Sequence, residues 1–394
     1  MLTTAVVVST QSVDSLLLVV PAGAAGSVAP DTAVAGLPLL RRIVLAGQRA
    51  GFARVVVQGD PSSFDRLLGG TAATALSGTA RVTTSHCRIV ILAANVVPQA
   101  RWLRALRESE IETERLYADA GATAVIDTDE PAAVLAAAAS SRSIGHLLDA
   151  LRARFDWADL KADDVGRFPL AAASDTGKAE SWLLRSLIKQ REGFMSRHFE
   201  RKISLALTRR LAVTRITPDV MTLVSLAIGL TGAPFFLSSS PAYQLTGALL
   251  FLLHSILDGC DGELARLKFV ESPHGAILDF WGDNVVHVAV FACMSVGLSF
   301  AQEATWPLAL GALTVAATLA AAAREASPIM QDTALGVDTG WRARLAEAFS
   351  SRDFIYLIIA MSAFGKAHWF LVFASVGTPI FFLLLLSIGA RRRA

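Results

Sequence analysis

Four aspartates in one short stretch of the chain have a spacing that could do chemistry. Asp258 and Asp261 are three residues apart, and Asp279 and Asp283 are four residues apart. On an α-helix, both spacings place the two side chains on one face. Two adjacent antiparallel helices would therefore point all four carboxylates into one cleft.

The aspartates lie among apolar runs of membrane length, where charge is costly. A charged residue deep in a membrane helix costs roughly 2.5 kcal/mol or more, and clustered carboxylates repel one another. A hard divalent cation such as Mg²⁺ or Mn²⁺ would offset both costs, because it prefers oxygen ligands and no Cys or His accompanies the carboxylates as a soft ligand. Four carboxylates have the capacity for two ions, and such a site can orient a pyrophosphate and activate a leaving group.

Small residues and one arginine accompany the aspartates. Gly262 and Ala265 share the side of the first pair, and Gly275 precedes Asp279 by one turn, which leaves room for a flat ligand. Arg266 offers a forked donor to phosphate oxygens. His287 continues the helical stripe beyond Asp283 and is either a packing histidine or a substrate contact.

Three alternative roles for the aspartates account for less of the pattern. Helix capping in a polar loop accounts for Asp258 or Asp261 singly, but not for two aspartates inside an apolar helix. A calcium loop of the EF-hand type requires an alternating D-x-D-x-D-G, which is missing. A carboxylate pathway in a transporter remains an alternative, although it leaves the glycines and Arg266 without a role.

The C-terminal half of the chain has the composition of a polytopic membrane domain. Apolar residues make up 53% of the sequence and charged residues only 18%, which is too apolar for an ordinary soluble protein. A spanning helix needs about 20 apolar residues, and six segments are predicted as spans: 218–238, 243–260, 276–299, 304–323, 353–369 and 370–390. The basic flanks of these spans fall on one side, which the positive-inside rule makes the cytoplasm.

The N-terminal half predicts a soluble α/β domain over residues 1–178. Short β-branched runs at 16–20, 53–59, 88–94 and 122–127 alternate with helical segments, a pattern typical of a mostly parallel, Rossmann-like sheet. Residues 179–216 space Arg and Lys among Leu, Ile and Phe, which predicts amphipathic helices at a membrane surface or, alternatively, a solvated linker helix. The membrane domain then covers 217–394.

Charge and cysteine content add little. The formal net charge of +2 gives no indication of a nucleic-acid partner. The three cysteines are widely spaced and suggest neither a disulfide framework nor a zinc site.

The pattern Asp258-x2-Asp261-Gly262-x2-Ala265-Arg266-x8-Gly275-x3-Asp279-x3-Asp283 resembles the motif of the CDP-alcohol phosphotransferase family, with all eight fixed positions filled. The resemblance covers about 215–390 and implies the six-helix membrane fold of that family, whose members are often dimers. These enzymes transfer a substituted phosphate group from a CDP-alcohol to the hydroxyl of a second alcohol and release CMP.

The resemblance also implies roles for individual residues. Asp258, Asp261 and Asp279 would hold the metal ions, and Asp283 would complete the metal site and act as the general base. Asp261, Gly262, Ala265, Arg266 and Gly275 would form the cytidine diphosphate side.

Further candidate residues lie near the start of the first span and at the span ends. Thr217 and Pro218 resemble family positions near the nucleotide, and Asp219 stands where an Asn is common. For an acceptor phosphate the candidates are Lys268, Arg324 and Arg352, with snorkelling or positive-inside flanks as the alternative role of these cations.

The wider chain is similar to proteins that fuse an inositol-1-phosphate cytidylyltransferase to a di-myo-inositol phosphate phosphate synthase. Residues 36–60 resemble part of a sugar-nucleotidyltransferase domain. The loop at 20–36, however, carries no basic residue, and "NVVP" at 95–98 replaces a metal-binding Asp. Without such groups a nucleoside triphosphate would not be held. We therefore expect a domain that has lost cytidylyltransferase activity and serves as a scaffold, regulator or partner surface.

The sequence does not identify the alcohol of the CDP-alcohol donor or the acceptor alcohol. The donor is CDP-inositol, CDP-diacylglycerol or another lipid-linked CDP-alcohol, and the acceptor resembles inositol phosphate or glycerol phosphate. A soluble nucleotide-sugar transferase tethered to a membrane is a further alternative. The expected location is the inner (plasma) membrane, with the active site and the N-terminal domain in the cytoplasm.

Overall fold

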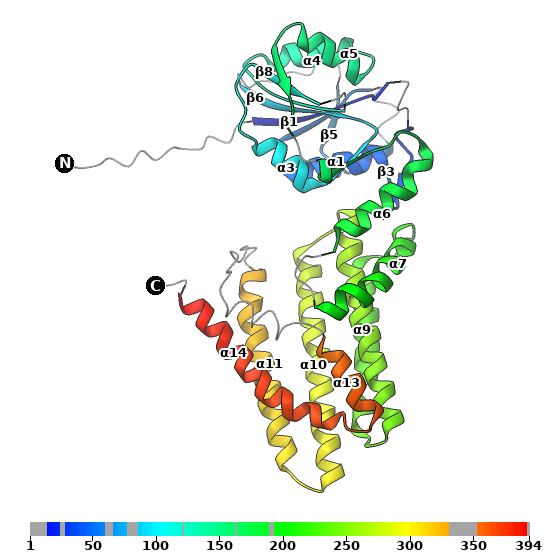
Figure 1. The fold of residues 1–394 in the computed structure, drawn as a ribbon, viewed down its shortest axis with the longest axis vertical. Helices are drawn as coiled ribbons and strands as arrows, with labels where there is room; N and C mark the ends of the chain where they lie inside the picture. Colours follow the sequence, from blue (N-terminus) through cyan, green and yellow to red (C-terminus); the bar gives the residue numbers. More distant parts are fainter. Residues whose placement is uncertain are drawn as a thin grey trace, which may run out of the picture. The chain divides into compact units, whose positions relative to one another are not determined.

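The computed structural model describes residues 14–23, 28–59, 66–76, 86–119, 122–161, 164–188, 193–330 and 353–391. The chain divides into two compact units, Met1–Leu183 and Leu184–Ala394, which Figure 1 shows as a sheet-containing part and an all-helical part. The division falls close to the expected end of the soluble domain at 178.

A seven-stranded sheet forms the centre of the first unit. Its strand order is β10-β8-β9-β6-β1-β4-β5, and the strands are β1 (Asp14–Val20), β4 (Arg54–Val57), β5 (Ala73–Ala75), β6 (Cys87–Ala93), β8 (Arg115–Ala118), β9 (Thr123–Thr128) and β10 (Asp156–Asp159). Two-stranded pairings join β2 (Ala33–Val34) to β3 (Leu37–Pro38) and β7 (Val96–Pro98) to β11 (Arg167–Pro169). The four predicted β-branched runs form β1, β4, β6 and β9, which confirms the mixed α/β class.

The sheet is mostly parallel, with one exception at its centre. β1 pairs in parallel with β4 and β6, whereas β9 runs antiparallel to both β6 and β8. Arg88 on β6 lies opposite Asp127 on β9 and donates two hydrogen bonds to its carboxylate, at 2.7 and 2.6 Å. Such a bidentate pair has a fixed geometry, so it favours this register of the antiparallel pair.

Helices cover both faces of the sheet (Figure 1). On one face lie α1 (Leu39–Ala50) and α3 (Ala100–Glu108), and on the other lie α4 (Pro131–Ser140) and α5 (Ile144–Arg152). The central strands are buried on both sides, as their Val, Ile and Leu runs require. Helix α6 (Thr176–Ser186) follows β11.

The described residues of the second unit form helices and their connections, with no strand among them. Its elements are η4 (Ser196–Glu200), α7 (Arg201–Ala212), α8 (Pro218–Gly232), η5 (Ala233–Leu237), α9 (Pro241–Lys268), α10 (Pro273–Gln302), α11 (Trp306–Met330), α13 (Phe354–Ala363) and α14 (His368–Arg391). A core of Phe236, Phe251, Val290, Met294, Ile358 and Leu371, among others, packs η5, α9, α10, α13 and α14 together.

Capping residues set where the long helices begin. Thr217 and Ser272 accept hydrogen bonds from backbone N–H groups of α8 and α10, and a proline follows each cap at the first helical position. Proline there loses no hydrogen bond and its fixed φ favours the helix. Helix α9 ends at Lys268, and the capping residue Phe269 that follows takes a left-handed φ of 58°. These signals place the end of α9 next to the start of α10.

Among the described residues, four helical segments are long and apolar enough to cross a membrane: Pro218–Leu237, Pro273–Gln302, Trp306–Ala326 and His368–Ser387. They correspond to four of the six predicted spans. The predicted span 243–260 lies in α9, which has 28 residues but is too polar to qualify. The predicted span 353–369 is interrupted, because α13 has only ten residues and Gly365 then turns the chain with φ at 65°. The described residues thus contain four candidate spans, and the six predicted spans are not confirmed.

Candidate functional site

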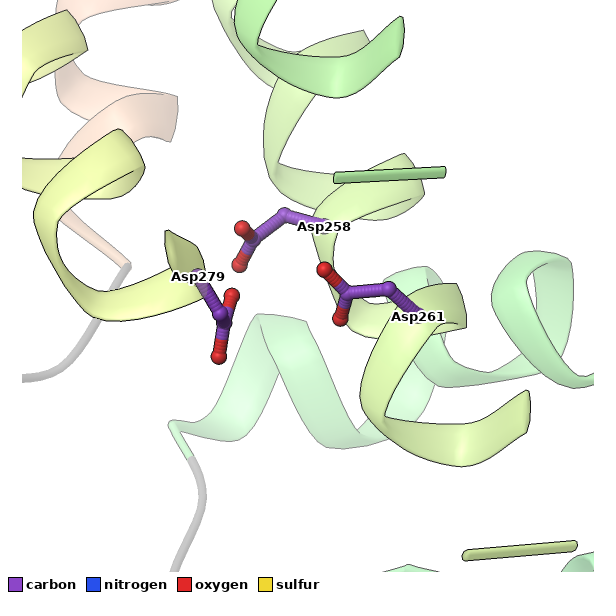
Figure 2. Close-up of side chains that lie close together, drawn as sticks. All are labelled: Asp258, Asp261 and Asp279. Atoms are coloured by element: carbon purple, nitrogen blue, oxygen red, sulfur yellow. The ribbon is translucent and has the colours of Figure 1, made fainter. Parts of the chain in front are cut away.

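Three of the four aspartates converge on one point. Asp258 and Asp261 from α9 and Asp279 from α10 each offer a carboxylate oxygen, and these oxygens all lie within 4.8 Å of one another. Figure 2 shows the three side chains pointing toward a common centre. Asp258 and Asp261 are buried, and Asp279 is half-buried. We call these three residues the carboxylate triad.

The triad fits a divalent metal ion. Its ligands are all carboxylate oxygens, the set that Mg²⁺ and Mn²⁺ prefer. Carboxylates this close repel each other unless a cation or protons intervene, and burial of Asp258 and Asp261 makes that cost larger.

A pocket opens beside the triad. It contains six of the residues expected on the cytidine diphosphate side or near the nucleotide, namely Pro218, Asp261, Gly262, Ala265, Arg266 and Gly275, together with Asp279. The guanidinium of Arg266 folds back over Gly262, where an added Cβ would lie 3.1 Å from Nη1. The absence of a side chain at Gly262 thus leaves space for the Arg266 guanidinium at the pocket wall.

Two helix N-termini line the same pocket. Pro218 and Asp219 begin α8, and Ser272, Gly275 and Ala276 begin α10. The first turn of a helix presents backbone N–H groups and the positive end of the helix dipole, so it attracts anions. Together with Arg266, these two termini make the pocket suitable for phosphate groups despite its acidic residues.

Thr222 is a site residue that the sequence did not indicate. It is buried on α8, lines the pocket, and its hydroxyl donates a hydrogen bond to Oδ2 of Asp261. Pro218 O lies 3.3 Å from the same hydroxyl. A threonine in an apolar helix carries no distinguishing signal, although its position one turn after Pro218 puts it on the face of α8 that begins with the capped terminus.

Asp283 lies outside the triad. Its Oδ1 is 3.4 Å from Nε2 of His254, and its Oδ2 is 3.9 Å from Nδ1 of His287. His254 is buried, and its Nδ1 lies 3.0 Å from the carbonyl oxygen of Ser225. Because a carbonyl only accepts, Nδ1 carries the hydrogen, and Nε2 faces the carboxylate. His254 is a second residue that the sequence did not single out.

The other predicted residues that the structure describes are not part of the pocket lining. Thr217 caps α8 by accepting from Val220 N at 3.4 Å. Lys268 donates to the carbonyl oxygens of Thr214 and Ile216, at 2.9 and 3.3 Å, so it holds the connection between α7 and α8. Arg324 is half-buried near the end of α11. Arg352 lies outside the described residues.

In the N-terminal unit, the position expected to lack a metal ligand has a structural contact instead. Asn95 precedes β7, and its Nδ2 donates to the carbonyl oxygen of Leu170 at 2.8 Å. This contact ties the start of β7 to the end of β11. The loop at 24–27 lies outside the described residues.

Residues 215–388 match the family described as CDP-alcohol phosphatidyltransferase. A bifunctional IPC transferase and DIPP synthase of Rubrobacter xylanophilus is 36% identical over 185 residues, which are 42% of this chain and 41% of that protein. A protein of the same description from Thermococcus kodakarensis is 35% identical over 134 residues, 34% of this chain and 30% of that protein. The chain thus spans less than half the length of these relatives.

The chain is also similar to solved structures, at a lower level. A crystal structure of Mycobacterium tuberculosis phosphatidylinositol phosphate synthase with CDP-DAG bound has 20% identity and a TM-score of 0.33, and the match covers 46% of this chain and 92% of that one.

Proposed function

We propose, from the premise that residues 215–388 belong to the CDP-alcohol phosphatidyltransferase family, that the protein is a membrane CDP-alcohol phosphotransferase. It transfers a substituted phosphate group from a CDP-alcohol to an acceptor alcohol and releases CMP. The observation that carries the proposal is the carboxylate triad beside a pocket lined by two helix N-termini and Arg266.

Each part of the pocket has a task in this reaction. The triad would hold Mg²⁺ or Mn²⁺, one or two ions, which when bound would neutralise the pyrophosphate and stabilise the leaving CMP. The N-termini of α8 and α10 and the fork of Arg266 bind and orient the phosphate oxygens. Gly262, Ala265 and Gly275 leave the pocket wall open to the nucleotide.

Asp283 is the proposed general base. It takes the proton of the acceptor hydroxyl, whose oxygen then attacks the β-phosphorus in line with the leaving group. Its position supports this role, because Asp283 lies outside the triad, with Oδ1 3.4 Å from Nε2 of His254, and is therefore separate from the principal metal ligands. A share of Asp283 in metal binding stays part of the proposal, with the triad as the principal ligand set.

The substrates are proposed as a class. The relatives' description as IPC transferase and DIPP synthase favours CDP-inositol as donor and an inositol phosphate as acceptor. CDP-diacylglycerol with an inositol or glycerol phosphate fits the same chemistry. Arg324 and Arg352 stay candidates for the acceptor phosphate, whereas the two carbonyl contacts of Lys268 favour a structural role for it.

We propose that the chain crosses the membrane six times, which is two crossings more than the four candidate spans. Six crossings would need α9 and α13 as well. Helix α9 is about 42 Å long, sufficient for a bilayer core of about 30 Å. Helix α13 is about 15 Å long and would need residues that precede it, which lie outside the described part. The basic flanks favour a cytoplasmic active site in the inner membrane, and family resemblance favours a homodimer.

The N-terminal unit is proposed as a scaffold or regulatory domain without cytidylyltransferase activity. The absence of basic residues from the sequence of the loop at 20–36 supports this, as does the use of Asn95 in a backbone contact.

The deciding experiment measures CMP release by the purified full-length protein. Donors would be CDP-diacylglycerol, CDP-inositol and CDP-glycerol, each paired with inositol phosphate, glycerol phosphate and inositol, with Mg²⁺, Mn²⁺ or EDTA. We expect CMP release from at least one pair, dependent on the metal and lost in Asp283→Asn. Asp149→Asn, at an exposed aspartate of α5, serves as the matched control. Substrate flux across vesicles without CMP release would instead support a transporter.

A further inference from the structure

Helix α7 forms hydrogen bonds with one buried glutamate of α9. Glu263 of α9 is fully buried, and three donors from α7 satisfy its carboxylate. Arg201 Nη1 and Ser204 Oγ each donate to Oε1 at 2.7 Å, and Thr208 Oγ1 donates to Oε2 at 2.7 Å. We call this arrangement the α7 clamp.

The clamp residues form a regular pattern on α7. Positions 201, 204 and 208 lie on one face at helical spacing, and Ser204 and Thr208 are buried. The sequence pattern predicted a helix lying on a membrane surface or a solvated linker. In the structure, one face of α7 packs against α9, whereas Lys202 and Arg210 on the same helix are exposed.

A glycine allows the two helices to meet closely. A Cβ added at Gly259 would lie 3.0 Å from Nη1 of Arg201. One residue later, the thiol of Cys260 lies 3.5 Å from the carbonyl oxygen of Ser204. The contact therefore extends over more than one turn of α9, directly behind the triad.

Glu263 and the triad residues occupy opposite faces of the same helix. At about 100° per residue, Glu263 is turned about 140° from Asp258 and about 160° from Asp261. The front face of α9 carries two of the three triad carboxylates, and the back face is held by α7. Any rotation or slide of α9 that the clamp prevents would move those carboxylates.

A second polar contact fixes the other end of the same segment. Ser255, three residues before Asp258, donates to Oε2 of the buried Glu200 at 3.3 Å. Glu200 ends η4 and directly precedes α7. Rotation of α9 about its axis is thus opposed at two levels that bracket Asp258 and Asp261.

We propose that Glu263 is a positioning residue for the carboxylate triad, and that the α7 clamp sets the affinity of the triad for a divalent cation. A buried charged pair adds little net stability compared with apolar packing, but it can define one geometry. Metal ligands must keep their distances within about 0.2 Å. At a radius of about 5 Å from the axis, a rotation of α9 by about 10° already moves a carboxylate by about 1 Å.

This inference shares one assumption with the proposed function, namely that the triad binds a divalent cation. Its test is Mn²⁺ binding to the full-length protein, measured by electron paramagnetic resonance without any substrate. In Glu263→Gln, which keeps the shape but removes the charge, we expect the Mn²⁺ dissociation constant to rise about tenfold, the lower end for residues that support metal ligands. Thr208→Val should give a smaller rise of about threefold.

Two variants control for simple loss of packing. Ser295→Ala removes an equally buried serine hydroxyl on α10, and Thr314→Val does the same for a buried threonine on α11. Both should leave the dissociation constant unchanged. A purely structural role of Glu263 would lower the number of binding sites per protein and leave the affinity of the remaining sites intact. Positioning raises the dissociation constant at full stoichiometry.

An unchanged Mn²⁺ dissociation constant in folded Glu263→Gln would overturn the clamp. If that variant does not fold, Thr208→Val decides by the same criterion. The proposed function fails separately, when the wild-type protein binds Mn²⁺ but releases no CMP from any donor. A wild-type protein that binds no Mn²⁺ would overturn both.

Discussion

Replacing Thr222 by valine removes one hydroxyl from the site and leaves its shape nearly unchanged. In the structure this hydroxyl lies between Asp261 Oδ2 and the carbonyl oxygen of Pro218. It has a single hydrogen to donate, and the charged and closer acceptor is Asp261. The variant therefore takes one donor from a buried triad carboxylate and replaces it with a methyl group.

The size of the effect follows from the type of hydrogen bond. A bond to a charged group contributes about 1.5–3 kcal/mol, and about 1.4 kcal/mol corresponds to a factor of ten. Thr222 donates its hydrogen bond from α8, whereas the triad residues themselves come from α9 and α10. We expect Thr222→Val to raise the Mn²⁺ dissociation constant or to lower kcat/KM for the CDP-alcohol by about 10- to 150-fold in total.

The assay combines Mn²⁺ binding with CMP release at saturating metal. Thr314→Val is the matched control, because Thr314 is equally buried but bonds to Leu310 O within its own helix. Its binding and turnover should match the wild type. If Thr222→Val stays within about twofold of the wild type in both measurements, the hydroxyl does not position Asp261 and the reasoning is wrong.

Two further predictions separate roles within the chain. Asp279→Asn should raise the Mn²⁺ dissociation constant at least about tenfold. Asp283→Asn should change that constant less than about threefold but lower kcat by about 10²–10⁴-fold, as loss of a general base does. An equal loss of Mn²⁺ affinity in both variants would make Asp283 a full metal ligand. In the N-terminal unit, burial is the main cause that raises the pKa of the Cys87 thiol to about 11. Only the thiolate reacts, so Cys87 should resist iodoacetamide at about pH 8 in the folded protein and react in urea. Labelling of Cys87 at the rate of a free cysteine would contradict that burial.

Four strands of the N-terminal sheet, β1, β4, β6 and β9, could be predicted because each contains a run of apolar residues, whereas β5, β8 and β10 do not. β1, β6 and β9 are buried on both faces, and only such runs of Val, Ile and Leu satisfy that position. The mostly parallel arrangement could be predicted, but the antiparallel direction of β9 could not be. The antiparallel placement of β9 beside β6 depends on partners far apart in the sequence, of which Arg88 and Asp127 are one pair.

The grouping of Asp258, Asp261 and Asp279 could be anticipated from spacing, since residues three apart on one helix must share a face. The separation of Asp283 from the triad could not. Asp283 lies one turn after Asp279 on α10, and its neighbour there is His254 of α9, which the local sequence pattern of neither helix indicates. Thr222 and Glu263 escaped notice for the same reason, because each acts through a contact between helices.

Polar residues on α9 explain two findings. They make this helix too polar for a candidate span, and one of them, Glu263, forms the α7 clamp. The helix carries Asp258 and Asp261 on its front and Glu263 on its back, and it also buries Gln244 and His254. Hydropathy counts each of these residues against a membrane position, although each has a polar neighbour within the protein that lowers the cost of its burial. A helix that holds a site on one face and its support on the other must look polar in sequence. Its 28-residue length is therefore compatible with the proposed crossing, although its hydropathy is too low for a candidate span.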